Sequence, residues 1–111
     1  MLQALRFLYD YNTWAMQRVL DAAGRLRLQQ FVAGQDGHEA IRDVLVHAVW
    51  AQWIWLERCR GASPAAFWQP GEFPYVAILA ARWRAVDTAT HTYLDTLTED
   101  DLERVISYQN F

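Results

Sequence analysis

The stretch AIRDVLVHAVWAQWIWL, residues 40–56, decides the fold, because no other part of the chain is as hydrophobic. Every residue in it is apolar except Arg42, Asp43, His47 and Gln52. On a helix, the apolar residues form two adjacent rows at steps of three and four, so most of the helix circumference must be covered. The stretch therefore predicts the central helix of a bundle, with one imidazole, His47, within its buried surface.

Signals at both ends of this stretch predict a helix over residues 37–60. Upstream, Asp36 and Glu39 have the spacing of a capping box, in which each side chain accepts the backbone amide of the other residue. Downstream, Gly61 is typical of the left-handed residue that ends a helix. A membrane span is disfavoured, because polar residues interrupt a run that is shorter than the roughly 20 apolar residues a bilayer requires.

Upstream, the sequence predicts one further long helix. Residues 2–24 repeat apolar side chains at helical spacing, with polar residues on the other side, and Gly24 marks the end. Asn12 falls on the apolar face, where a buried amide must be hydrogen-bonded, so we expect it to fix how this helix packs. Residues 25–35 predict a loop with room for one extra helical turn.

Downstream, prolines divide the chain. The segment ASPAAFWQPGEFPY, residues 62–75, holds all three prolines and predicts an ordered loop anchored by its aromatic residues. Residues 74–97 predict a third long helix with Pro74 in its first turn. Residues 98–101 carry a capping signature sufficient for one helical turn, and the residue types of 105–110 favour a strand. The expected fold is all-α, with three helices and a terminal strand.

Size and composition limit the classes of protein to consider. A chain of 111 residues makes one domain, so we expect residues 1–111 to form a single helical bundle. The net charge of -3 and the lack of a basic stripe argue against a nucleic-acid partner. All ten basic residues are Arg, so no lysine can form a Schiff base or bind phosphate in a glycine-rich loop. The single cysteine, Cys59, is expected to be inert. One cysteine cannot form an internal disulfide, and the N-terminus does not have the pattern of a secretion signal, so we expect a cytoplasmic location and no membrane partner.

Few side chains are candidates for chemistry. From its position alone, His47 is most simply a hydrogen-bonded core histidine. Asp43 lies four residues earlier on the same face, and it could either hydrogen-bond the imidazole or pair with Arg42 at the surface. Asp87 and His91 have the same spacing, which can orient an imidazole, but no nucleophile is recognisable beside them and a solvated pair is favoured.

Several segments, taken in order, resemble one protein family. They are YNTWA at residues 11–15, LVHAVWAQWIWLER at 45–58, the loop with Gly61 and Pro64, Phe73 and Pro74 before the third helix, and LTEDDLERVISYQN at 97–110. Together they resemble the DinB family over nearly the whole chain. The resemblance implies an up-down four-helix bundle that is often a homodimer.

The resemblance also implies a divalent metal ion, zinc or nickel, held by three histidines. His47 matches the ligand on the second helix of the family, whereas neither His38 nor His91 matches a ligand. The other two ligands form a His-x-x-x-His pattern on a fourth helix, and this sequence has no such pattern. We therefore expect a bundle that is incomplete at its C-terminus, with weak or absent metal binding by this chain alone.

The function implied by the resemblance is that of a metal-dependent hydrolase or thiol transferase that acts on a small molecule. In such an enzyme, a metal at His47 would lower the pKa of water or a thiol. No catalytic side chain is assigned. The alternative is a non-catalytic helical bundle that dimerises or binds a partner through aromatic side chains, among them Trp50, Trp53 and Trp55.

Overall fold

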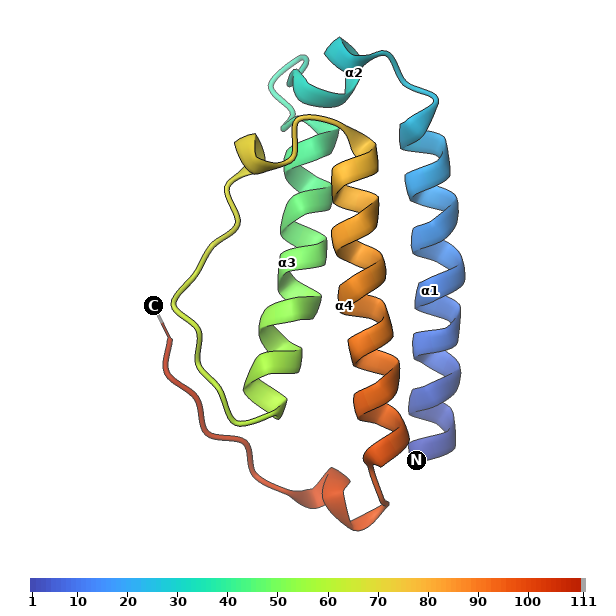
Figure 1. The fold of residues 1–111 in the computed structure, drawn as a ribbon, viewed down its shortest axis with the longest axis vertical. Coiled ribbons are helices and arrows are strands. Elements are labelled where there is room, and N and C mark those ends of the chain that lie inside the picture. The colour runs from blue at the N-terminus through green and yellow to red at the C-terminus, as the bar shows by residue number, and fades with distance from the viewer. Residues whose placement is uncertain (111) are drawn as a thin grey trace.

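The chain forms three long helices that lie side by side (Figure 1). The computed structural model describes residues 1–110. Its long helices are α1 (Leu2–Gly24), α3 (Ile41–Cys59) and α4 (Val76–Thr96), joined and followed by the short α2 (Leu28–Val32), η1 (Pro70–Glu72) and η2 (Asp100–Glu103). Within this part of the chain there is no β-strand, which confirms the all-α prediction. None of these helices combines the length and the apolar character needed to cross a bilayer.

The middle position in the bundle belongs to α4, which packs against both α1 and α3 (Figure 1). The prediction that the helix from residues 40–56 would be central is therefore wrong. α3 packs against α4, α2 and η1, and a stripe that includes Ile41, Val44 and Trp55 remains exposed. Hydrophobicity alone indicated that α3 should be covered, but it could not indicate which neighbouring element would cover each side.

The direction of the helices departs from simple alternation. α1 and α3 run in opposite directions, but α3 and α4 run the same way, because the chain between them returns along the length of α3 (Figure 1). A 19-residue helix is roughly 28 Å long, and nine extended residues span up to roughly 30 Å. The proline-containing loop after Gly61 is thus long enough to make this return.

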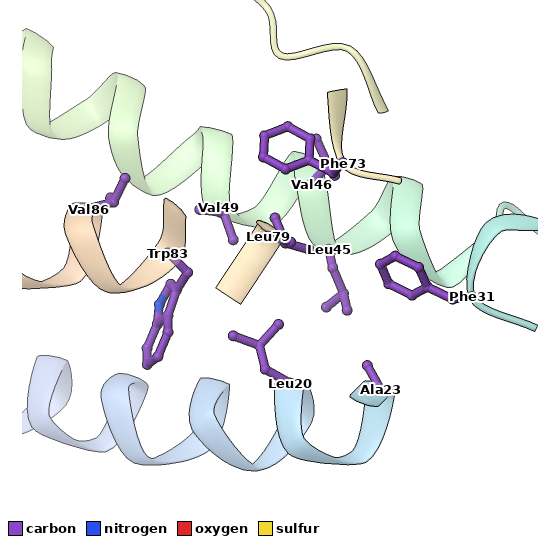
Figure 2. Close-up of a cluster of buried hydrophobic side chains, with 10 residues drawn as sticks. All are labelled: Leu20, Ala23, Phe31, Leu45, Val46, Val49, Phe73, Leu79, Trp83 and Val86. Carbon is purple, nitrogen blue, oxygen red and sulfur yellow. The ribbon is translucent and has the colours of Figure 1, made fainter. Parts of the chain in front are cut away.

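The core lies where the ends of α1, α3 and α4 meet α2 (Figure 2). Its buried side chains are Leu20, Ala23, Phe31, Leu45, Val46, Val49, Phe73, Leu79, Trp83 and Val86. Val49 and Leu79 are completely buried, and burying a side chain of this size contributes about 1.5–3 kcal/mol. Phe31 of α2 and Phe73 after η1 close the cluster, which explains why these short elements are ordered.

The start of α3 differs from the prediction. Asp36 and Gly37 have φ angles of 51° and 78°, and the His38 amide donates to the Gln35 carbonyl at 2.8 Å. This is the turn that Asp-Gly sequences favour, because both central residues adopt left-handed conformations. The capping box predicted at Asp36 and Glu39 does not form, and α3 begins at Ile41.

The end of α3 confirms the stop predicted at Gly61, whose φ is 91°. The Gly61 amide donates to the Arg58 carbonyl at 3.1 Å, and the Ala62 amide donates to the Glu57 carbonyl at 2.9 Å. These two bonds form a Schellman motif, which satisfies carbonyls that the last helical turn leaves unpaired.

The loop between α3 and α4 is anchored by aromatic residues, as predicted. The Trp50 indole N–H donates to the Ala66 carbonyl at 2.7 Å, and the Trp50 ring stacks on Phe67 with 4.3 Å between centroids. Trp53 similarly contacts Trp68, with 5.2 Å between ring centroids. The loop therefore covers one side of α3.

α4 begins slightly later than predicted and is followed by the expected helical turn. Its N-cap is Tyr75, so Pro74 lies before the first turn and not within it. The Thr98 amide donates to the Asp101 carboxylate at 2.8 Å at the start of η2. The last predicted turn is thus confirmed.

The predicted strand at residues 105–110 does not form within the described residues. This tail is held mainly by side chains: the Gln109 amide donates to Ser63 Oγ at 2.9 Å, and Tyr108 packs edge-on against Trp55. Residue types favoured a strand, but a strand also requires a neighbouring strand to receive its hydrogen bonds, and residues 1–110 provide none.

Candidate functional site

His47 lies midway along α3, and its side chain is exposed. The prediction of a buried, hydrogen-bonded core histidine is therefore wrong. The neighbouring Val46 and Val49 face the core, and the 100° step between successive helical residues turns His47 away from it. Within residues 1–110 its ring nitrogens form no hydrogen bond, and its ring lies 5.6 Å from that of Trp50.

A shallow hollow of about 540 Å³ opens beside His47. Aromatic side chains of α3 and the following loop form one wall, and Glu39 and Asp43 bring two carboxylates to its lining. Within the described residues Asp43 forms no hydrogen bond to the imidazole, and its Oδ1 accepts one from Arg42 Nε at 3.1 Å. The surface-pair interpretation of Asp43 is thus the one that the structure supports.

The three histidines lie apart, and the described residues do not make a complete metal site. His38 is in the turn before α3, whereas His91 is on α4. Residues 1–110 contain no group of three or more His, Cys, Asp or Glu side chains placed to hold a metal ion. Zinc sites use three or four protein ligands, so a single imidazole at His47 does not fit a tightly bound ion.

A second polar group joins α1 to α4; the sequence indicated its members Asp87 and His91 but not their partner Thr13. Thr13 Oγ1 donates to Asp87 Oδ2 at 2.7 Å, and it lies 2.8 Å from His91 Nε2. The other ring nitrogen, Nδ1, is 3.8 Å from the exposed carboxylate of Asp10. Asp87 is only 6% exposed, so Asp87 and His91 are not the solvated pair that was predicted.

The same network extends to α3 through side-chain amides. Gln52 Nε2 donates to Asp87 Oδ1 at 3.2 Å and to Thr90 Oγ1 at 3.1 Å. Asn12 Nδ2 donates to Gln52 Oε1 at 3.4 Å. Asn12 thus has the hydrogen bond between helices that its predicted role in packing requires, and all three long helices share one polar network.

The contacts of this network hold the three long helices together. A hydroxyl has one proton, and that of Thr13 is directed to Asp87, with the Tyr9 carbonyl as a second acceptor at 3.1 Å. The position lies inside α1, where backbone amides are already bonded within the helix and cannot stabilise a developing oxyanion. The network satisfies the buried carboxylate of Asp87 and connects the three long helices.

A largely apolar cavity of about 560 Å³ is lined by residues of α1, α3 and α4 and of the segment after α4, with Asn12, Gln52 and Thr90 among its polar lining residues. Cys59 also lines this cavity, and burial raises the pKa of its thiol. A raised pKa means less thiolate at neutral pH, which supports the prediction that Cys59 is inert.

Fold and site together define a class: a bundle of three long helices with the exposed imidazole of His47 on one side of α3. The model of the DinB superfamily matches residues 11–111, and the chain belongs to this superfamily. Comparison with curated proteins gives no match. Comparison with solved structures gives none either.

Proposed function

We propose that the chain is a relative of metal-dependent hydrolases or thiol transferases, and that His47 supplies one ligand to a divalent ion, zinc or nickel. The observation that carries this proposal is the exposed imidazole of His47, which has no hydrogen-bond partner among residues 1–110, beside a hollow open to solvent. Neutral imidazole is the most common protein ligand for such ions.

Completion of such a site needs ligands from outside residues 1–110, because the described residues hold no cluster of three. When bound, the ion would supply activation of water or a thiol. The part of this chain is to present the His47 ring on a rigid helix and to surround it with aromatic side chains. The hollow would accept a small-molecule substrate, and we propose a cytoplasmic setting because the lone Cys59 has no disulfide partner.

Equilibrium dialysis with nickel and zinc tests this proposal on three proteins: the unmodified chain, His47→Ala and His38→Ala. His38 is the matched control, because it is also an exposed imidazole. We expect weak uptake that His47→Ala removes and His38→Ala preserves. Equal uptake by all three proteins would remove the metal proposal for this chain.

A second candidate function is favoured by the surface of α1. Phe7, Leu8, Tyr11 and Trp14 are each more than half exposed. Exposed apolar clusters of this kind are typical of interfaces. A non-catalytic homodimer formed through α1 would bury them.

Sedimentation at several concentrations tests the dimer with Leu8→Glu and, as a control, Gln3→Glu on the same helix. We expect the unmodified chain and Gln3→Glu to dimerise and Leu8→Glu to remain monomeric, because it places a charge in the interface. A chain that stays monomeric at all concentrations contradicts this candidate.

A further inference from the structure

Three arginines meet at the end of α3, away from His47. Arg58 and Arg60 come from the last turn of α3 and the residue after it, and Arg104 follows η2. They line a hollow of about 220 Å³ together with Gly61 and Ser107. A hollow of this size accommodates a small ionic group but not a large substrate.

Arg58 is the unusual member of this group, because it is a buried cation without an acidic partner. The residue is 6% exposed and forms no ion pair within residues 1–110. Its guanidinium lies over the rings of Trp55 and Tyr108, at 4.6 and 4.2 Å, and Nη2 donates to the neutral Asn110 side chain at 3.1 Å. Arg58 Nε is buried and has no hydrogen-bond partner among the described residues.

The other two arginines leave much of this positive charge uncompensated. Arg104 Nη2 donates to two neutral oxygens, the Tyr93 hydroxyl at 3.0 Å and the Cys59 carbonyl at 3.4 Å. Arg60 is 3.6 Å from Glu57, in a partly exposed pair that water screens. The Asp101 carboxylate interacts electrostatically with Arg104, but it accepts its hydrogen bond from the Thr98 backbone amide.

We propose that this hollow binds a small oxyanion, the phosphate or carboxylate group of a small molecule. Guanidinium groups donate in a planar fork that matches the oxygens of such groups, and a buried cation gains most from a bound anion. The negative end of the α3 dipole opposes an anion here. However, the Schellman bonds already occupy the Arg58 and Glu57 carbonyls, and charge-assisted bonds outweigh a dipole effect near the surface.

Thermal unfolding in phosphate, acetate and chloride at equal ionic strength tests the proposal and separates the two anion sources. Phosphate stabilises many proteins by exclusion from their surface, so the result depends on the difference between variants in the same salt. The variants are Arg60→Gln and Arg104→Gln, with Arg84→Gln on the exposed side of α4 as the matched control.

We expect phosphate or acetate to raise the Tm of the unmodified chain and of Arg84→Gln by the same amount, beyond the chloride value. Arg60→Gln and Arg104→Gln should each bind the stabilising anion about tenfold more weakly, the loss expected for one charge-assisted bond. The proposal is overturned if all four proteins respond equally to every salt, or if Arg84→Gln loses as much as the other two. Arg58 stays unchanged in all four proteins, because a folding defect at this buried position would obscure the anion response.

Discussion

At the residue scale, the decisive feature of this molecule is the contrast between two imidazoles. His91 has Thr13 and Asp87 within bonding or ion-pair distance, whereas the ring nitrogens of His47 form no hydrogen bond within the described residues. Both side chains occur in amphipathic segments, and both have an aspartate four residues earlier. Only the positions of the other helices separate them, so local sequence could not.

Thr13→Val should lower the free energy of unfolding by about 1–3 kcal/mol, because it removes the hydroxyl that donates to the buried Asp87 carboxylate. Urea denaturation measures this change. Thr88→Val is the matched control, an exposed position on α4, and it should change stability by less than about 0.5 kcal/mol. Equal effects at the two positions would show that the Thr13 bond contributes nothing specific.

Cys59 should react slowly with iodoacetamide near pH 8, because burial raises the pKa of its thiol and the thiolate is the reactive form. The urea-unfolded chain provides the reference rate, which should be higher. The same raised pKa makes the free energy of unfolding depend on pH. This free energy is highest below the unfolded pKa of about 9 and falls as the pH rises through the folded pKa, because the folded state holds the thiol proton more tightly. Equal rates in the folded and unfolded chain contradict this account.

At the element scale, local signals predicted the helices well. Periodicity gave α1, α3 and α4, and Gly61 gave the end of α3, since these features depend on residues close in sequence. The residues before α3 are compatible with either a capping box or a tight turn, and the structure has the turn at Asp36 and Gly37. Residues 105–110 do not form the predicted strand, because residues 1–110 contain no neighbouring strand to exchange hydrogen bonds with them.

Two glycines at helix ends should respond to alanine with opposite signs. Gly61→Ala forces a side chain into a φ of 91° and should destabilise the protein by about 1–2 kcal/mol. Gly24 is the last residue of α1, its φ is not positive, and there is open space for an added Cβ. Gly24→Ala should therefore raise the free energy of unfolding by about 0.5–1 kcal/mol. Thermal or urea unfolding of the pair measures both; two changes of the same sign would refute the conformational assignment of Gly61.

At the scale of the whole molecule, the sequence predicted the class of fold and the family but not the arrangement. The long return loop between α3 and α4 allows these two helices to run in the same direction. It also allows α4 to lie between α1 and α3. The Thr13 to Asp87 bond and the group of Arg58, Arg60 and Arg104 bring together residues that are far apart in the chain. Long-range contacts of this kind leave no periodic signal in one sequence.

The central proposal is that His47 is the imidazole with which this bundle coordinates a divalent metal ion. The most direct measurement is an NMR titration of the three histidine rings with paramagnetic nickel in one sample. We predict that the His47 ring resonances broaden at the lowest nickel concentration, before those of His38 and well before those of His91, which is bonded to Thr13. If His47 broadens together with His38 or after it, His47 is an ordinary surface histidine and the claim is contradicted.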